Sequence, residues 1–182
     1  MIRNVAVFCA SANGSNPVYQ IVAQELGRAL GRRNVALIYG GANVGLMRTV
    51  AEAALAVQGK VIGVIPEVLV DLEVAHQGIT ELHITSTMHT RKALIGEKAD
   101  AFIALPGGFG TLEELFEVLA WHTLKLHAKP ILLLNIRGFY DKLLTFLDHC
   151  VAEGMLKPKS RELLLVANTV EEALDFLQIT VP

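Results

Sequence analysis

The sequence predicts one α/β domain over residues 1–182, with a Rossmann-like, doubly wound parallel sheet in a three-layer sandwich. Two observations predict this fold class. Short, continuously apolar segments, typical of strands buried on both faces, alternate with helical patterns along the chain. The length of 182 residues and the hydrophobic content of 52% also suit a single domain that buries a large core.

The predicted elements follow a regular order. Strands are expected where apolar, strand-forming residues run together, at residues 4–10, 35–40, 60–66, 81–85, 100–108, 130–136 and 163–168. Helices are expected where apolar residues recur at helical spacing, at residues 18–33, 46–59, 88–99, 111–127, 139–154 and 170–178. This order implies parallel strands joined by right-handed crossovers.

The composition argues against a membrane protein and against a secreted one. The longest apolar stretch is interrupted by Pro66 and Glu67, so no segment reaches the roughly 20 apolar residues of a membrane span. The first residues run directly into a strand-like segment and lack the layout of a signal peptide. Cys9 and Cys150 lie far apart and form no CxxC motif, so we expect a cytoplasmic protein with reduced thiols.

The net charge and the leucine content indicate which binding partners to expect. The net charge is −2, from 16 Lys+Arg against 18 Asp+Glu, and this balance does not suggest a nucleic-acid surface. We therefore expect neither nucleic acid nor membrane as a partner. The helix at 111–127 carries more leucine than one core face needs, which indicates a dimer at least.

Four polar or glycine-rich stretches follow predicted strands, at residues 9–16, 39–45, 86–92 and 105–111. In a doubly wound sheet, ligands bind beyond the carboxyl ends of the strands, so we expect these stretches to converge on one rim. None of them reads G-x-G-x-x-G, and no GK[ST] follows the glycines. NAD-linked redox chemistry and ATP hydrolysis are therefore disfavoured.

The stretch PGGFGT, residues 106–111, has the chemistry of an anion site. Gly107, Gly108 and Gly110 let backbone N–H groups approach a ligand closely. The helix that is expected to start near Thr111 adds unpaired amides and the positive end of its dipole. The same residues also fit a purely structural turn between a strand and a helix, and both interpretations stay open at this point.

Charged residues next to this stretch have two interpretations each. Thr111 and Glu114 have the spacing of a capping box, and spacing alone favours that role for Glu114. Glu113, in the same turn, suggests that acidic residues here do more than cap. Arg91 and Lys92 open a helical segment and oppose its dipole, which indicates a functional role unless they form a solvated basic turn.

Other polar residues give weaker signals. His122 and His127 do not have the H-E-x-x-H spacing and no cysteine joins them, so we expect no metal site. No cofactor motif is present either, and we expect no cofactor. Ser11 and Gly41 are possible ligand contacts, although serine in a loop after a strand usually only turns the chain.

Taken together, these residues resemble the LOG ("Lonely guy") family of cytokinin riboside 5'-monophosphate phosphoribohydrolases, whose members have often been labelled lysine decarboxylase-like. The stretch PGGFGTLEE fits the family signature P-G-G-x-G-T-x-x-E. VFCASANG is similar to the first strand and loop of the family, YGGANVGLM to its second glycine loop and MHTRKA to its basic segment. ADAFIALPGGFGTLEELFEVLAW and KPILLLNIRGFYDKLL extend the resemblance over nearly the whole chain.

The resemblance implies a Rossmann-like homodimeric hydrolase without a cofactor. It would cleave the N-glycosidic bond of adenosine 5'-monophosphates, N6-substituted or plain, and release the free base and ribose 5-phosphate. By position, the resemblance implies that Arg91 and Glu114 are the catalytic pair. It also implies these substrate contacts: Glu73, Met88, Arg91, Lys92, Gly107, Gly108, Phe109, Gly110, Thr111, Leu112 and Glu113. The decarboxylase label has no support in the residues, since no lysine lies in a recognisable pyridoxal phosphate motif.

Breaking the bond between ribose and a purine builds positive charge on the sugar, and a carboxylate beneath the ribose stabilises that charge. Glu114 would supply the carboxylate and Arg91 would anchor the substrate. Two alternatives remain: a nucleotide-binding or sensing module without turnover, and a general AMP nucleosidase. Four departures from the family pattern bear on which base is preferred; they are Ala42, Arg48, Thr90 and Ala120.

Overall fold

The structure is a computed structural model, and it describes residues 1–73 and 75–180, without the side chains of residues 71–73. In this part of the chain, seven parallel strands form one sheet in the order β4-β3-β2-β1-β5-β6-β7. The strands are β1 (Asn4–Phe8), β2 (Ala36–Tyr39), β3 (Val61–Pro66), β4 (Glu81–Thr85), β5 (Ala101–Ala104), β6 (Ile131–Leu134) and β7 (Leu164–Ala167). The predicted doubly wound parallel sheet is confirmed.

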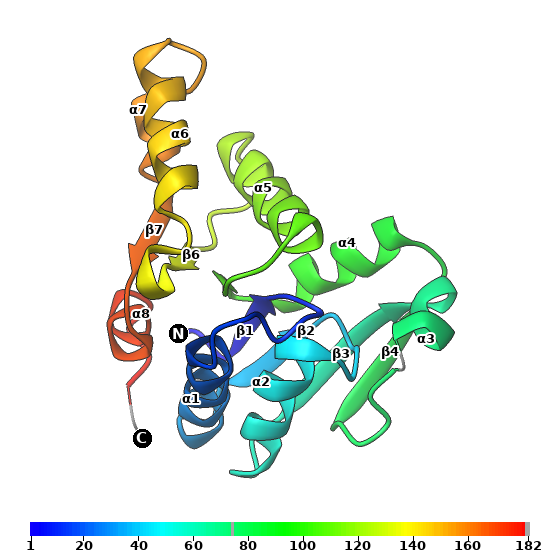
Figure 1. The fold of residues 1–182 in the computed structure, drawn as a ribbon. Coiled ribbons are helices and arrows are strands. Elements are labelled where there is room, and N and C mark those ends of the chain that lie inside the picture. Colours follow the sequence, from blue (N-terminus) through cyan, green and yellow to red (C-terminus); the bar gives the residue numbers. More distant parts are fainter. Residues whose placement is uncertain (74, 181–182) are drawn as a thin grey trace.

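Helices cover both faces of the sheet (Figure 1). On one face lie α1 (Val18–Arg32), α2 (Gly45–Leu55) and α8 (Val170–Phe176). On the other face lie α4 (Met88–Lys98), α5 (Phe109–Thr123) and α6 (Asp141–Ala152). Three short helices connect the larger elements: α3 (Glu67–Glu73), the 3₁₀ helix η1 (Ile136–Gly138) and α7 (Pro158–Arg161).

The strands are continuously apolar because they pack helices on both sides. Along β1, Val5 and Val7 belong to the core under α1, α2 and α8, whereas Ala6 and Phe8 belong to the core under α4, α5 and α6. Successive side chains of a strand point to opposite faces, so each face of β1 receives every second residue. The same alternation places Ile103 and Ala104 of β5 in opposite cores.

The boundaries differ from the sequence-based ones where the chain enters its glycine loop. The strand predicted at residues 100–108 ends at Ala104, and the helix predicted from Thr111 begins at Phe109. Pro106 has no N–H to donate to a sheet, and Gly108 takes the N-cap position, which ends the strand and starts the helix earlier. The short helices α3 and α7 were not predicted.

Within residues 1–73 and 75–180, no helix is both long and apolar enough to cross a membrane.

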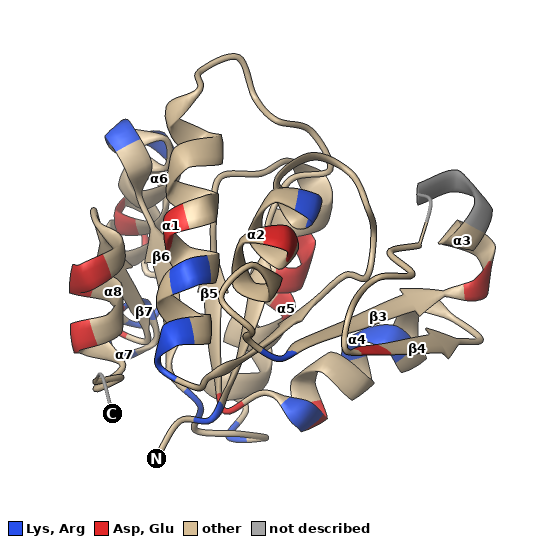
Figure 2. Cartoon of the chain, turned by 90° about the horizontal axis from the view of Figure 1, so that it is seen from below, with Lys and Arg blue, Asp and Glu red and all other residues tan. Residues whose placement is uncertain are grey.

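Acidic and basic residues are interspersed over the described helices seen in Figure 2, and they do not form a basic stripe there. The expectation that the chain does not bind nucleic acid stays a prediction.

Candidate active site

The candidate site lies where the strand order reverses. β1 pairs with β2 on one side and with β5 on the other, so the loops after β1 and β5 leave the sheet toward opposite faces. A cleft of about 330 Å³ opens at this point. The described residues that line it are Cys9, Ala10, Ser11, Ala12, Met47, Leu69, Met88, Arg91, Gly108, Phe109, Gly110, Thr111 and Glu114.

The loop after β1 is fixed by the start of α2. The backbone N–H of Leu46 donates to the carbonyl oxygens of Ala10 at 3.1 Å and Ala12 at 3.3 Å. Gly45 has a φ of +54° and lies so close to the backbone of Ser11 that a side chain there would overlap it. The glycine therefore allows the two loops to lie against each other and holds Ser11 at the cleft.

Gly41, the other possible ligand contact, holds two segments of the chain together. Its φ is +78°, and its carbonyl oxygen accepts a hydrogen bond from the N–H of His76 at 2.9 Å. An isolated antiparallel bridge between Ala42 and Ala75 lies beside this bond. Gly41 thereby ties the segment after α3 to the second glycine loop, and it is not among the described residues that line the cleft.

The loop after β5 is held at its start from two sides. The N–H of Leu105 donates to Phe8 O at 2.9 Å, and the carbonyl oxygen of Leu105 accepts from the buried Tyr140 hydroxyl at 2.7 Å. Gly107 packs directly against the Thr111 side chain, leaving no room for a Cβ. The loop therefore enters α5 in a fixed conformation.

The first turn of α5 faces the cleft with unpaired amides. Its N-cap is Gly108, which forms no side-chain cap hydrogen bond, and the first bond within the helix runs from Leu112 N to Gly108 O at 3.0 Å. The amides of the residues between them have no acceptor within the helix. A Cβ at Gly108 or Gly110 would meet no atom within 4 Å, so an anion has open access to this turn.

The capping box predicted for Thr111 and Glu114 is wrong. Thr111 is the third residue of α5, and Glu114 lies in the second turn, beyond the reach of the N-cap at Gly108. A capping box does occur at α4, where Thr87 and Thr90 exchange hydrogen bonds of 3.1 Å between side chain and backbone. Thr90, a departure from the family pattern, thus fixes the start of the helix that carries Arg91.

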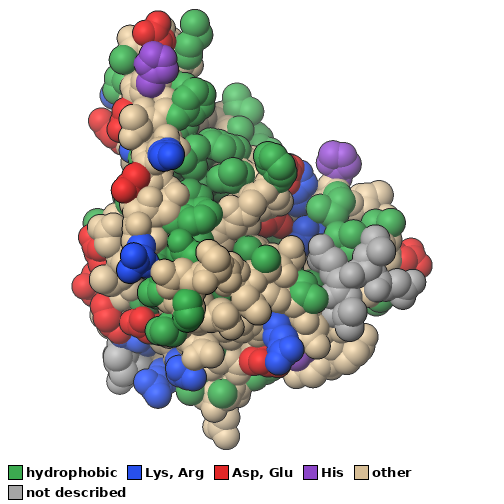
Figure 3. All heavy atoms as spheres, in the orientation of Figure 1, with side chains coloured by type: hydrophobic (Ala, Val, Ile, Leu, Met, Phe, Trp, Pro, Cys, Tyr) green, Lys and Arg blue, Asp and Glu red, His purple; other side chains and the backbone are tan. Residues whose placement is uncertain are grey.

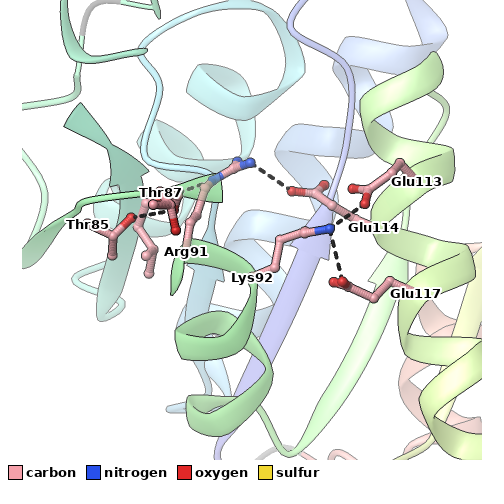
Figure 4. A network of polar contacts seen from close by, with 8 residues as sticks. Thr85, Thr87, Arg91, Lys92, Glu113, Glu114 and Glu117 are labelled. Carbon is pink, nitrogen blue, oxygen red and sulfur yellow. Dashed lines mark hydrogen bonds and ion pairs between the residues drawn. The ribbon is translucent and has the colours of Figure 1, made fainter. Parts of the chain in front are cut away.

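Arg91 and Glu114 form a buried ion pair at the cleft. Arg91 Nη1 lies 3.2 Å from Glu114 Oε1, and the two side chains are 8% and 11% exposed (Figure 4). Arg91 Nε donates to the carbonyl oxygen of Val64 at 3.0 Å. Nη2 lies against Gly40, at a position where any Cβ would overlap it. The guanidinium is therefore held by β3, by the residue after β2 and by α5 at the same time.

Lys92, the next residue of α4, reaches α5 at a different place. Its Nζ contacts Glu113 Oε1 and lies 2.9 Å from Glu117 Oε1 (Figure 4). Carboxylates of α5 thus compensate the two cations near the start of α4. This offsets their unfavourable interaction with the dipole of α4, which the sequence had indicated.

Cys9 lines the floor of the cleft and is buried. Burial raises the pKa of the Cys9 thiol far above its usual range, and the charge of Glu114 raises it further. The thiol is therefore protonated at neutral pH and is not poised as a nucleophile.

The structure brings eight of the sequence-predicted site residues to the cleft, which are Ser11, Met88, Arg91, Gly108, Phe109, Gly110, Thr111 and Glu114. Five others are not among the described residues that line the cleft, namely Gly41, Lys92, Gly107, Leu112 and Glu113. Glu73 is the last residue of α3, and its side chain lies outside the described part of the structure.

Several residues of the site were missed by the sequence analysis. Cys9, Met47 and Leu69 look like ordinary core residues in the sequence, and Gly40 looks like one more loop glycine.

The described residues contain no group of three or more His, Cys, Asp and Glu side chains placed to hold a metal ion.

Comparison with known proteins gives similarity over almost the whole chain. A family model described as "Possible lysine decarboxylase" matches residues 47–177. The chain is 49% identical over 173 residues to the cytokinin riboside 5'-monophosphate phosphoribohydrolase of Rhodococcoides fascians, which covers 94% of this chain and 87% of that one. It is 47% identical over 176 residues to a probable phosphoribohydrolase of the same description from Oryza sativa subsp. japonica, which covers 97% and 72%. Among solved structures, the protein TM1055 matches with a TM-score of 0.73 and 23% identity over 97% of this chain and 98% of that one, which shows a shared fold.

Proposed function

Because the chain belongs to the LOG family of cytokinin riboside 5'-monophosphate phosphoribohydrolases, we propose that it hydrolyses the N-glycosidic bond of adenosine 5'-monophosphates. The substrates would include N6-substituted ones, and the products are the free base and ribose 5-phosphate. The observation that carries the proposal is the buried Arg91–Glu114 pair, which shares one cleft with the open amides of α5.

The chemistry of the cleft supports this reaction. Loss of the base leaves an oxocarbenium-like sugar, and the Glu114 carboxylate in the cleft can stabilise its positive charge and orient the attacking water. Arg91 fixes that carboxylate by its ion pair. The start of α5 would hold the 5'-phosphate, so that binding energy from a group that does not react positions the group that does.

An apolar side of the cleft suits the base. Met47, Leu69, Met88 and Phe109 contribute to its lining, and Phe109 is 95% exposed. These side chains would contact the purine and an apolar N6 substituent.

Side-by-side product analysis on AMP and isopentenyl-AMP tests the proposed function: base and ribose 5-phosphate are expected from at least one of the two compounds. Release of neither product by the pure protein would leave a binding module without turnover.

The name of the family model is not matched by the chemistry of the cleft. Of the described residues that line it, none is a lysine that could hold pyridoxal phosphate as a Schiff base. Lys92 lies nearby, but its ammonium is engaged by Glu113 and Glu117. We therefore do not propose a decarboxylase.

Adenosine should be a much poorer substrate than AMP, because the open amides at Gly108–Thr111 would lose their anion. We expect kcat/KM to fall by on the order of 100-fold or more, since a phosphate held at a helix start contributes several charge-assisted hydrogen bonds. Steady-state kinetics on the two compounds measures this. Equal kcat/KM values would show that this loop does not bind the 5'-phosphate.

We also propose a homodimer, formed through an apolar groove beside α5. The groove has a volume of about 330 Å³. Its apolar lining consists of Phe116, Leu119, Ala120, Leu147, Leu156 and Leu164. Figure 3 shows hydrophobic side chains gathered in the hollow between α5 and the projecting α6–α7 segment. Exposed Leu124, Phe146 and Met155 extend the apolar character beyond the groove. Exposed apolar side chains gathered on one surface can mark a subunit interface.

Replacing Phe116 with arginine should convert the dimer into a monomer, because a charge would be buried at the centre of the interface. Light scattering of the wild type should give roughly twice the 19.7 kDa of one chain, and the variant should give the mass of one chain. Phe176→Arg, on α8, is the control, since Phe176 is also partly exposed to solvent (48% against 39% for Phe116), and it should remain dimeric. A wild type of about 20 kDa across micromolar concentrations would exclude this dimer.

A cytoplasmic location is likewise proposed. Cys9 and Cys150 are both unpaired thiols, as expected in a reducing compartment. Cell fractionation would test it.

A further inference from the structure

Lys92 follows Arg91 on α4, but the two side chains meet different parts of α5. Arg91 pairs with Glu114. The Lys92 ammonium contacts Glu113 and Glu117, and the Lys92 side chain is only 10% exposed. Figure 4 shows the two cations of α4 side by side, each directed at a carboxylate of the facing helix. Lys92 thus bridges the two acidic residues that flank Glu114 in the sequence of α5.

A substrate phosphate would find Lys92 already occupied. The described residues that line the cleft include Arg91 and Glu114, but not Lys92, Glu113 or Glu117. The group as a whole has two cations against three carboxylates, so its charge does not attract a phosphate. The capacity to bind an anion lies instead with the open amides at the start of α5.

The arrangement also explains why Lys92 stays charged. Burial alone would favour the neutral amine, but the hydrogen bonds and charges of Glu113 and Glu117 outweigh it and raise the pKa of Lys92. In return, the ammonium compensates two like charges that are one helical turn apart and would otherwise destabilise α5.

We infer that Lys92 is a positioning residue that ties the first turns of α5 to α4 and thereby sets the distance between Arg91 and Glu114. It acts through these two residues and does not bind the substrate phosphate. The inference rests on the proposed function, since the distance matters for the stabilisation of the cationic sugar. Small displacements of a reacting group are costly: about 1 Å can lower a rate by roughly 100-fold.

The test compares Lys92→Met with Lys92→Arg, and with Lys98→Met as a control on the same helix. For Lys92→Met we expect kcat on AMP to fall about 10-fold or more, while KM for AMP and the Kd of ribose 5-phosphate change less than about 3-fold. Lys92→Arg keeps the charge and should retain at least about half of the wild-type kcat, and Lys98→Met should be unchanged. Calorimetry with ribose 5-phosphate provides the Kd.

The opposite pattern would overturn the inference: kcat retained in Lys92→Met, with KM and the Kd of ribose 5-phosphate raised about 10-fold or more, as for a phosphate ligand. If Lys92→Met does not fold, Glu117→Gln weakens the same bridge without leaving the ammonium unpaired. It should lower kcat about 3-fold with an unchanged Kd, and a wild-type kcat would refute the positioning role. Failure of the wild type to cleave any nucleoside monophosphate would instead refute the proposed function. In that case the Kd of ribose 5-phosphate alone decides whether Lys92 binds phosphate.

Discussion

Replacing Glu114 with glutamine should lower kcat on AMP by on the order of 100-fold or more, a loss of about 2.7 kcal/mol in transition-state stabilisation. Glutamine has the size of glutamate and its side-chain oxygen can still accept from Arg91, which lies 3.2 Å away in the native pair. It cannot neutralise a cationic sugar. Binding of AMP should be largely kept, because the charge on the sugar develops mainly in the transition state.

The stability of Glu114→Gln separates this role from a structural one. The change leaves the buried Arg91 guanidinium without a counter-charge, so we expect a lower melting temperature but a folded protein at 25 °C. Glu113→Gln is the matched control, since Glu113 is its neighbour but lies outside the described lining of the cleft. The control should lose less than about 5-fold in kcat. A folded Glu114→Gln variant with more than half of the wild-type kcat would assign Glu114 a structural role.

Gly40→Ala should also lower activity strongly, although Gly40 is not expected to touch the substrate. A Cβ at this position would overlap Arg91 Nη2 and lie 3.0 Å from Met47 Sδ. The guanidinium cannot withdraw without breaking its bond from Nε to Val64 O. We expect kcat/KM on AMP to fall about 10-fold or more, because Arg91 and with it Glu114 are displaced.

Gly96→Ala is the control for Gly40→Ala, because a Cβ at Gly96 meets only Trp121, at an ordinary contact distance of 3.4 Å. It should keep full activity and should stabilise α4, since alanine is a better helix former than glycine. Kinetics and thermal melts of the two variants check both statements. A wild-type kcat/KM in Gly40→Ala would show that the guanidinium has more freedom than its contacts suggest.

The sequence was sufficient to predict the fold, and it indicated the rim of the sheet where the candidate cleft lies. The alternation of apolar strands and helical patterns depends on local residue order, and the ends of parallel strands meet at one rim by topology. The glycines of residues 106–111 predicted a turn in which backbone amides are open to a ligand. These inferences needed no knowledge of which side chains meet in space.

The surroundings of Glu114 were harder to predict because they depend on a helix boundary. With the helix starting at Thr111, spacing favours a capping box. With the start at Phe109, the same glutamate lies in the second turn and pairs with Arg91. A difference of two residues thus changes the interpretation, and helix boundaries are the least certain part of a sequence-based assignment.

The contacts of Arg91 could not be read from the sequence at all. Val64 and Gly40 precede it by 27 and 51 positions in the numbering, and both are ordinary strand or loop residues by type. Only the pairing of β2 with β3 and the return of α4 over these strands bring them to the guanidinium. Cys9, Met47 and Leu69 were missed for a related reason, because apolar residues that line a cleft and those that fill a core look the same in a sequence.

The contacts of Arg91 require the shape of an arginine side chain, and a positive charge alone would not satisfy them. One planar group directs Nε to a strand carbonyl, Nη1 to a carboxylate and Nη2 against a bare glycine backbone. A lysine at this position would carry the same charge on a single, freely rotating ammonium that cannot satisfy two separated acceptors at once. An exchange of arginine for lysine, usually regarded as mild, would therefore break the contact with Val64 or the contact with Glu114. The geometry of the fork, and not only its positive charge, is what this cleft requires.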